Sequence, residues 1–417
     1  AGWSVDTRTL QPGDLFFALR EGHNYVRAAF ERGAVAAVVE HRFEGPGNLI
    51  RVDDTLVALQ DLATRARAQW GGQVVAITGS AGKTTTKDIV AHLLASELPV
   101  GKTIGNLNNH VGVPLSILRL PDDCRVAVLE MGMNHAGEIR ELARIARPNI
   151  AVITNVGYAH IEFFNSIEDI ALAKREIIDE LEGGTAVLNA DDPRVAGFPH
   201  RGPVVTYGLS EHAAIRAEDV ELTSTGARFR CLGVDFESPL AGLHGVSNVL
   251  AGIAVAHVFG IETEKLREPV RALPLGNMRG QRIQHNGLTI LNDCYNSNPE
   301  AARAMIDVLQ STAARRRVAV LGEMLELGQS AERLHREIGK YIAESGIEVL
   351  IGIRGAARHM VDEAIVAGLP GGAAYFFEDS ASAGGFLREY LRDGDAILFK
   401  GSRGVRVERA MNRVLET

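Results

Sequence analysis

Short runs of β-branched and other apolar residues alternate with amphipathic helical patterns along almost the whole chain. Runs at residues 74–78, 125–130 and 149–154 are examples, and each is followed by a segment with apolar residues at helical spacing. This alternation is typical of βαβ units, in which parallel strands form a sheet and helices cover its faces. The pattern therefore predicts an α/β protein.

The chain has 417 residues, which is too long for one ordinary domain and suits two or three. Glycines and prolines interrupt the alternation at residues 71–72 and again at residues 273–276, including Leu275. We therefore expect three domains, at residues 1–72, 73–276 and 277–417.

Each of these segments has its own pattern. The first is predicted to be a small α/β domain, and the second a parallel-sheet domain of the phosphate-loop ATPase type with a β-rich appendage at residues 213–239. The third is predicted to be a Rossmann-like, doubly wound sheet. Its expected strands lie at residues 288–292, 317–321, 349–353 and 396–400.

Composition excludes several classes of function. Hydrophobic residues make up 46% of the chain and charged residues 23%, which is typical of an ordered globular protein. The 52 acidic side chains outnumber the 44 basic ones and give a formal net charge of −8, so we expect no nucleic acid partner. The most apolar stretch, at residues 246–261, is too short to span a bilayer, and we expect no membrane insertion.

The three cysteines lie far apart and form no C-x-x-C pair, which argues against a disulfide framework and against a zinc site. A reducing cytoplasm is therefore the expected location. The sequence begins at Ala1, inside what reads as structured chain, and we expect natural N-terminal residues to precede it.

A glycine-rich segment joins the strand at residues 74–78 to a helical pattern, and it reads Thr78-Gly79-Ser80-Ala81-Gly82-Lys83-Thr84-Thr85. Backbone amides in such a turn bind phosphate groups, a lysine offsets their charge, and a threonine hydroxyl coordinates Mg²⁺. The motif is shorter than the usual one, because Ile77 stands where the first glycine belongs. The alternative, a glycine-rich turn without a ligand, is disfavoured because strand, glycines, lysine and hydroxyls coincide. We predict an ATP site.

Three further polar residues stand beside this segment in the expected sheet. Glu130 ends an apolar run at the carboxyl edge, where a Mg²⁺ ligand is expected, although taken alone it reads as a solvated edge residue. His160 follows the strand at residues 149–154 and is either a metal ligand or a capping side chain. Lys174 lies on a charge-rich face of a helical pattern, which predicts a surface residue.

Together these motifs resemble the Mur ligases, the ATP-dependent amide ligases that build the peptide stem of bacterial cell-wall precursors. The resemblance covers nearly the whole chain. It is carried by residues 79–84, 105–115, 155–160, 173–176 and 292–299, with Asn248 and Arg279.

Within the family, residues 295–299, 321–328 and 400–403 resemble the members that use D-Ala-D-Ala. The resemblance implies that ATP phosphorylates the terminal carboxylate of UDP-N-acetylmuramoyl-tripeptide and that the amine of D-Ala-D-Ala attacks the acyl phosphate. It also implies that the first domain binds the uridine nucleotide and that the domains close over the site, with a hinge near residues 273–282. We expect a monomer.

Residue roles also follow from the resemblance. The catalytic residues are Lys83, Glu130, His160 and Lys174. One or two Mg²⁺ ions would be bound by Thr84, Glu130, His160 and Lys174, the last as a carbamate (N6-carboxylysine). ATP contacts beyond residues 78–85 are Asn248, Arg279, Asp293, Tyr295 and Asn296. Substrate contacts are Asp6, Thr7, Arg8, Asn108, Asn109, Lys400, Ser402 and Arg403.

Two alternatives stay open. One is a Mur-type ligase that adds the third amino acid, which is disfavoured because the Asp-Asn-Pro-Arg motif of those members is absent. The other is a nucleotide-binding regulatory protein on the same fold, because a fold does not fix a function. That second hypothesis requires a broken phosphate or metal site, whereas Lys83, Thr84, Glu130, His160 and Lys174 are all present.

Overall fold

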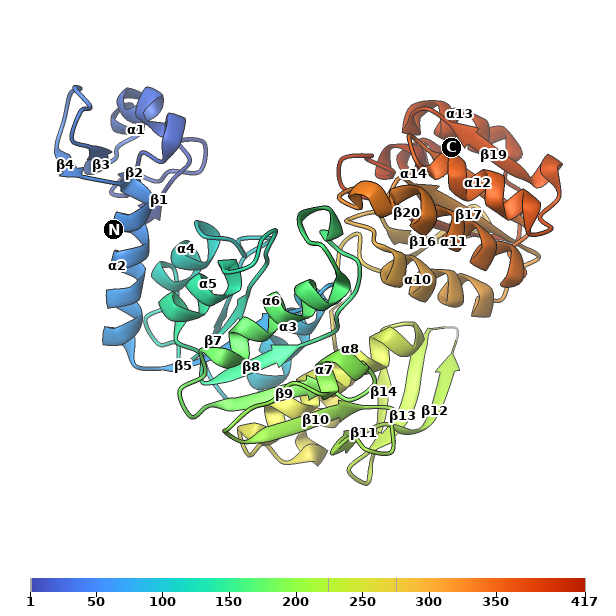
Figure 1. The fold of residues 1–417 in the computed structure, drawn as a ribbon, viewed down its shortest axis with the longest axis horizontal. Helices are drawn as coiled ribbons and strands as arrows, with labels where there is room; N and C mark the ends of the chain where they lie inside the picture. The colour runs from blue at the N-terminus through green and yellow to red at the C-terminus, as the bar shows by residue number, and fades with distance from the viewer. Residues whose placement is uncertain (1, 224, 275, 417) are drawn as a thin grey trace.

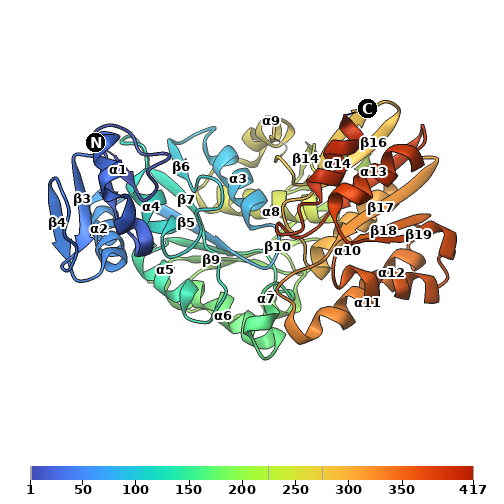
Figure 2. The ribbon, with the colours of Figure 1, turned by 90° about the horizontal axis from the view of Figure 1, so that it is seen from above.

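The structure is a computed structural model that describes residues 2–223, 225–274 and 276–416. Ala1 and the predicted linker residue Leu275 lie outside these ranges. Three units follow one another along the long axis of the molecule, with the N-terminal and C-terminal units at opposite ends and the central unit between them (Figures 1 and 2). The predicted domain boundaries after residues 72 and 276 fall between these units and stay predictions.

A parallel four-stranded sheet in the order β1-β2-β3-β4 forms the N-terminal unit. Its strands are β1 (Trp3–Ser4), β2 (Leu15–Phe17), β3 (Ala36–Glu40) and β4 (Leu49–Val52). Its helices are the 3₁₀ turn η1 (Arg20–Tyr25), α1 (Val26–Glu31) and α2 (Thr55–Trp70). Asp54 caps α2 by accepting the amides of Leu56 and Val57, which satisfies two of the donors that a helix start leaves open.

The helix α2 joins the N-terminal unit to the central unit. Leu59, in its first half, packs with Phe17 and Val38 of the N-terminal sheet. In its second half, Arg67 Nε donates to the carbonyl of Ala146 at 2.7 Å, and Trp70 Nε1 donates to that of Cys124 at 2.7 Å. Because one helix is anchored on both sides, it fixes how the two units sit relative to each other.

The central unit is built on a seven-stranded parallel sheet in the order β11-β10-β9-β8-β5-β7-β6. Its strands are β5 (Gln73–Thr78), β6 (Val100–Lys102), β7 (Val126–Glu130), β8 (Ile150–Ile153), β9 (Thr185–Asn189), β10 (Val204–Gly208) and β11 (Ile215–Arg216). Its helices are α3 (Lys83–Leu94), α4 (Gly112–Leu118), α5 (Glu138–Ala146), η2 (Ile161–Phe163), α6 (Ile167–Asp179), α7 (Pro193–Ala196), α8 (Gly242–Val258), η3 (Thr263–Leu266) and α9 (Arg267–Arg271).

Alternate residues of β5 face opposite sides of this sheet, as the period of two in a strand requires. Val75 and Ile77 pack with α3 and α8, whereas Val74 and Ala76 pack with α5 and α6. Helices therefore cover both faces, and the central strands β7 and β8 are buried along their whole length and almost entirely apolar.

The predicted β-rich appendage is confirmed as a separate antiparallel sheet of β12 (Glu218–Thr223), β13 (Gly226–Cys231) and β14 (Val234–Ser238). The first strand of the predicted segment, β11, belongs instead to the edge of the central sheet.

The C-terminal unit has a six-stranded sheet in the order β15-β16-β20-β17-β18-β19. Its elements are β15 (Gln281–His285), β16 (Leu288–Asp293), α10 (Pro299–Ser311), β17 (Arg316–Gly322), η4 (Gly328–Ser330), α11 (Ala331–Glu344), β18 (Val349–Ile353), α12 (Ala357–Val366), η5 (Gly371–Ala373), β19 (Ala374–Phe377), α13 (Ser380–Tyr390), β20 (Asp395–Lys400) and α14 (Glu408–Leu415). Helices α10 to α12 pack on one face, and α13 and α14 on the other. The sheet is doubly wound as predicted, with one antiparallel edge strand, β15.

The topology brings the functional segments together. Strand β5 lies between β7 and β8, with Ile77 opposite Glu130 and Thr78 opposite Ile153. The carboxyl ends of these three parallel strands therefore meet at one edge, which is where ligands bind in open α/β sheets. Within the described ranges, no helix is long and apolar enough to cross a membrane.

Candidate active site

The glycine-rich turn between β5 and α3 has a shape that two of its residues can adopt only as glycines. Gly79 has φ +152°, and a Cβ there would collide with Thr154 Oγ1. Gly82 has φ +79°, and its Cβ would lie 2.7 Å from Asn248 Oδ1. The glycines therefore permit both the backbone conformation and the close approach of neighbouring side chains.

Asn155 holds the first half of this turn. The amide of Ser80 donates to the Asn155 carbonyl at 2.9 Å, and the amide of Ala81 donates to Asn155 Oδ1 at 2.8 Å. The amides at positions 82–85 have no acceptor in the described part of the chain. These unpaired donors lie at the start of α3, where the helix dipole favours an anion. The arrangement suits phosphate binding by the second half of the turn.

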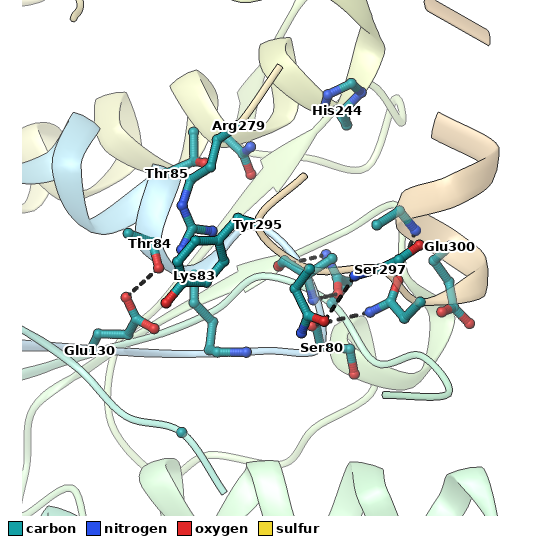
Figure 3. Close-up of a pocket in the computed structure, with 18 of the residues that line it drawn as sticks. Ser80, Lys83, Thr84, Thr85, Glu130, His244, Arg279, Tyr295, Ser297 and Glu300 are labelled. Carbon is teal, nitrogen blue, oxygen red and sulfur yellow. Dashed lines mark hydrogen bonds between the residues drawn. The ribbon is translucent and has the colours of Figure 1, made fainter. Parts of the chain in front are cut away.

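Lys83 begins α3 and lines the same cavity as Arg279 and Tyr295 (Figure 3). Its Nζ donates to the carbonyl of Gly79 at 2.8 Å. Burial lowers the pKa of the Lys83 ammonium; the charge of Glu130 opposes that shift, and the charge of Arg279 adds to it. An incoming polyanion would restore the charged form, because it supplies the negative charge that the buried amine lacks.

Glu130 ends β7 and is buried, with 2% of its surface exposed, so it is not the solvated edge residue that the strand pattern alone suggests. Thr84 Oγ1 donates to its Oε2 at 2.6 Å (Figure 3). Asn108 Nδ2 donates to its Oε1 at 2.7 Å. A carboxylate and a hydroxyl are hard oxygen donors, which is the donor type that Mg²⁺ prefers. The described residues contain no cluster of three or more His, Cys, Asp or Glu side chains that could hold a metal ion. Any Mg²⁺ here therefore also needs oxygens from other groups.

His160 precedes the 3₁₀ turn η2 and lines the same cavity. Its side chain makes no capping hydrogen bond to that turn, so the capping alternative is not what the structure has. Instead, its Nδ1 lies 2.5 Å from Oε2 of Glu326, which belongs to the C-terminal unit. His160 is thus held between two units.

Lys174 lies on α6 and is buried, with 2% of its surface exposed. The surface position expected from its charged neighbours is therefore wrong. Burial lowers the pKa of Lys174 well below its ordinary value, and the charge of Lys83 lowers it further. Lys174 is not among the residues that line the cavity, but its amine is near enough to Lys83 for the two charges to interact.

The C-terminal unit supplies another wall of the site. The guanidinium of Arg279 lies 3.9 Å from the ring centre of Tyr295, a cation–π contact. Lys400 Nζ lies 2.5 Å from Asp293 Oδ2 and donates to the carbonyl of Asn296 at 2.8 Å. Lys400 is therefore already paired and is 2% exposed.

These groups line one cavity of about 640 Å³ between the central and C-terminal units. The predicted site residues that line it are Ser80, Ala81, Gly82, Lys83, Thr84, Thr85, Asn108, Asn109, Glu130, His160, Asn248, Arg279, Asp293, Tyr295, Asn296 and Lys400. Its size and its mixed polar wall suit a nucleotide.

Other predicted site residues lie elsewhere. Ser402 is buried and accepts the amide of Leu325 at 2.9 Å, and Arg403 pairs with Glu408 at 3.0 Å. In the N-terminal unit, hydrogen bonds from Arg8 lower the pKa of Asp6 to about 2. The predicted site residues that do not line the cavity are Asp6, Thr7, Arg8, Thr78, Gly79, Lys174, Ser402 and Arg403.

Sequence reasoning missed several contacts between the units. Asn298 caps α10 and donates through Nδ2 to the carbonyl of Ser80 at 3.3 Å. Glu300, two residues later, accepts a hydrogen bond from the amide of Tyr158 at 3.1 Å, and burial raises its pKa. The Asn-Pro pair at 298–299 signals a helix start, but no local pattern predicts which distant backbone group the helix start will contact.

Models of known protein families match most of the chain. The model of the Mur ligase middle domain matches residues 77–256, and that of the Mur ligase glutamate ligase domain matches residues 278–403. The UDP-N-acetylmuramoyl-tripeptide–D-alanyl-D-alanine ligase of Bacillus subtilis is 36% identical over 100% of this chain and 93% of its own length. The chain belongs to the Mur ligase family. It is therefore an ATP-dependent ligase.

Further relatives extend the match over the full length of the fold. The ligase of the same name from Synechocystis is 37% identical over 99% of this chain and 91% of its own. A crystal structure of MurF from Acinetobacter baumannii superposes with a TM-score of 0.91 at 30% identity and covers 100% of this chain and 93% of that one. The crystal structure of MurF from Thermotoga maritima in complex with ADP superposes with a TM-score of 0.88 at 28% identity. It covers 100% of this chain and 97% of that one. The three-unit α/β fold is thus that of a MurF ligase.

Proposed function

We propose that the chain joins D-Ala-D-Ala to UDP-N-acetylmuramoyl-tripeptide at the expense of ATP, as a cytoplasmic monomer. The observation that carries this proposal is a single cavity lined by residues of two units. Lys83, Thr84 and Glu130 come from the central unit, and Asp293 and Tyr295 come from the C-terminal unit. The substrates are those named for the relatives that match the whole chain.

The chemistry explains why a phosphate site belongs in a ligase. A carboxylate resists nucleophiles because of its charge, so the γ-phosphoryl group of ATP is first transferred to the terminal carboxylate of the tripeptide. This gives an acyl phosphate and ADP. The amine of D-Ala-D-Ala, after losing a proton, attacks the acyl carbon, and the tetrahedral intermediate collapses to an amide with phosphate as the leaving group. The site must therefore stabilise negative charge on phosphate oxygens.

The central unit would bind the triphosphate. The four unpaired amides at positions 82–85 and the Lys83 ammonium supply donors and charge, and Lys83 exchanges the Gly79 carbonyl for a phosphate oxygen. Arg279 would add a second positive charge from the connection to the C-terminal unit. Adenine and ribose would lie against Asn248 and residues 293–296, which line the same cavity.

A Mg²⁺ site fits the residues beside the phosphate loop. Thr84, Glu130, His160 and a carbamylated Lys174 would hold one or two ions. When bound, Mg²⁺ offsets charge on the phosphate oxygens during transfer. Asn108 and Thr84 orient the two oxygens of the Glu130 carboxylate, which keeps this anion in place before the ligand arrives.

The carbamate on Lys174 follows from its charge state. A neutral amine, not an ammonium, adds CO₂, with loss of one proton to give the carbamate. Burial and the charge of Lys83 both lower the pKa of Lys174 and so favour the neutral amine. The carbamate would replace a group that repels Mg²⁺ with an anionic oxygen ligand, and it would pair with Lys83.

The remaining assignments concern the two peptide substrates. Asn108 and Asn109 line the cavity and would contact the tripeptide arm, while residues 6–8 of the N-terminal unit would bind the uridine nucleotide. Lys400, Ser402 and Arg403 would contact D-Ala-D-Ala. Ser402 and Arg403 lie outside the cavity, so this assignment requires a shift of the C-terminal unit on substrate binding.

The direct test measures phosphate release from ATP and Mg²⁺ with UDP-N-acetylmuramoyl-tripeptide, with and without D-Ala-D-Ala, while mass spectrometry follows the pentapeptide product. We expect release that depends on the dipeptide and equals product formation. Phosphate release with another amino acid acceptor in place of D-Ala-D-Ala would point to a different Mur ligase reaction. No release with any acceptor, together with intact ATP binding, would contradict the proposal.

A further inference from the structure

The contact between His160 and Glu326 joins two units at a residue that faces the cavity. The Nδ1–Oε2 distance is 2.5 Å, and Glu326 follows β17 in the C-terminal unit, more than 160 residues away in sequence from His160. His160 lines the cavity, whereas Glu326 does not. The contact therefore joins a cavity-lining residue of the central unit to a residue of the C-terminal unit that does not line the cavity.

Both residues have an unusual backbone conformation. His160 has φ +64° and Glu326 has φ +63°, although neither is a glycine. Such left-handed conformations cost free energy for ordinary residues and persist where the surroundings impose them. Two of them at the two ends of one contact indicate that both loops are shaped to bring these side chains together.

The loop that carries Glu326 is held firmly. The amide of Leu325 donates to Ser402 Oγ at 2.9 Å, and that of Met324 donates to His335 Nε2 at 3.0 Å. On the other side, the amide of Glu162 donates to the Glu326 carbonyl at 3.2 Å. Ser402, which sequence resemblance assigns to the dipeptide, thus supports the Glu326 loop in this structure.

The two loops also approach closely at Gly328. A Cβ at Gly328 would lie 2.8 Å from the Cβ of Glu162, and Gly328 has φ +51°. A glycine is therefore required both by the backbone conformation and by the neighbouring loop. The contact between η2 and η4 is built into the packing and does not depend on the ion pair alone.

A carboxylate at one ring nitrogen determines what the other nitrogen can do. Nδ1 of His160 lies 2.5 Å from the Glu326 carboxylate, an ion-pair contact that does not meet the geometry of a hydrogen bond. A carboxylate beside one ring nitrogen favours the tautomer that has its proton there, and this tautomer leaves the lone pair of Nε2 for an electrophile. Carboxylates placed in this way orient metal-binding histidines and raise their basicity. We propose that Glu326 is a positioning residue for His160, supplied by the C-terminal unit, that prepares Nε2 to bind the Mg²⁺ of the ligase reaction.

This inference rests on the metal role proposed for His160 and adds a consequence. Because Glu326 comes from the C-terminal unit, the metal site is complete only when that unit sits against η2. The position of the C-terminal unit and the affinity for the ion are then coupled, and each stabilises the other.

The test measures Mn²⁺ binding to the full chain by electron paramagnetic resonance, in bicarbonate buffer without nucleotide. His160→Ala and Glu326→Ala are each expected to weaken Mn²⁺ binding by about 10- to 100-fold. Their combination should be little worse than either alone, because both remove the same interaction. Glu326→Gln keeps a polar oxygen beside Nδ1 but lacks the charge, so its affinity for Mn²⁺ should lie between those of the unaltered chain and Glu326→Ala. Glu162→Gln, in an exposed position of the facing loop, is the matched control and should bind like the unaltered chain.

Two outcomes would overturn the inference and are distinguishable. If His160→Ala weakens Mn²⁺ binding and both Glu326 variants do not, the metal role of His160 stands and the role of Glu326 is refuted. If neither His160→Ala nor Glu326→Ala changes it, the metal role of His160 fails, and the inference fails with it. Thermal unfolding and ADP affinity of each variant report whether it is folded.

Discussion

The two buried lysines of the central unit, Lys83 and Lys174, have different surroundings. Lys83 has the Gly79 carbonyl at 2.8 Å and the charge of Glu130 nearby, whereas Lys174 has the repulsive charge of Lys83 and no counter-ion in the described part of the chain. An amine in the second situation is stable only when neutral. This difference explains why one lysine suits phosphate binding and the other suits modification.

Lys83→Ala is expected to lower the rate of pentapeptide formation by roughly 10²–10³-fold or more, because it removes the positive charge that the proposal assigns to the transferred phosphoryl group. The measurement is product formation by mass spectrometry at saturating ATP. Lys340→Ala, on the exposed side of α11, is the control and should leave the rate unchanged. Near-normal turnover by a folded Lys83→Ala variant would refute the phosphate role.

Lys174→Ala is expected to lose activity, because the carbamate oxygen and its charge are both removed. Short carboxylic acids, such as acetate or propionate, should restore part of the rate by occupying the space of the missing carbamate. For the unaltered chain, activity should fall after removal of CO₂ and return with bicarbonate. Full activity of Lys174→Ala would contradict the assignment.

The burial of Lys174 could be predicted only in part from the sequence. Ile170, Lys174 and Ile177 follow one another at helical spacing and are all buried, so the apolar face of α6 includes the lysine. The charges of Lys174 and of its neighbours in the sequence favoured a surface position, so its burial was not predicted from the sequence. The burial of Glu130 could not be predicted either. Its two oxygens accept hydrogen bonds from Thr84 and Asn108, which belong to other segments, and the pattern of a single strand does not indicate such partners.

At the scale of elements, the turn between β5 and α3 depends on the clearance around Gly79. Gly79→Ala is expected to lower the free energy of unfolding by about 1–3 kcal/mol and to weaken ADP binding, because the new methyl group collides with Thr154 Oγ1. Thermal unfolding and calorimetric titration with ADP measure the two effects.

The matched control is Gly385→Ala, an exposed position of α13 with open space around its Cβ. It should raise the free energy of unfolding by about 0.5–1 kcal/mol and leave ADP binding unchanged. If Gly79→Ala behaves like Gly385→Ala, the close contact with Thr154 is not a constraint on the loop.

The elements of the C-terminal sheet show what a sequence pattern can and cannot supply. Central strands are continuous apolar runs, and the predicted strand at residues 349–353 matches β18 (Val349–Ile353). The edge strands β15 and β19 were missed. β15 is polar and antiparallel, and β19 is short and only half buried, so neither has the apolar signature of a strand with two covered faces.

At the scale of the whole molecule, the site is assembled from separate units. The helix α2 fixes the N-terminal unit to the central one. The C-terminal unit meets the central unit through the packing of α10 on α8 and of η4 on η2, and through polar contacts such as Asn298 with Ser80 and Glu326 with His160. Motion of the C-terminal unit is expected, since relative motion is the default for domains of one chain.

Small-angle scattering tests that motion. An ATP analogue added together with UDP-N-acetylmuramoyl-tripeptide is expected to reduce the radius of gyration, because an acyl phosphate must be kept from water and closure excludes it. Either ligand alone should produce a smaller change. An unchanged scattering curve with all ligands bound would contradict closure around this cavity.

The central claim is that the cavity activates a carboxylate by phosphoryl transfer before the amide bond forms. The most direct test uses UDP-N-acetylmuramoyl-tripeptide with ¹⁸O in its terminal carboxylate and follows the label by mass spectrometry during ligation with D-Ala-D-Ala. An acyl phosphate predicts one labelled oxygen in the inorganic phosphate for each amide bond formed. Amide formation without label in the phosphate would contradict the account.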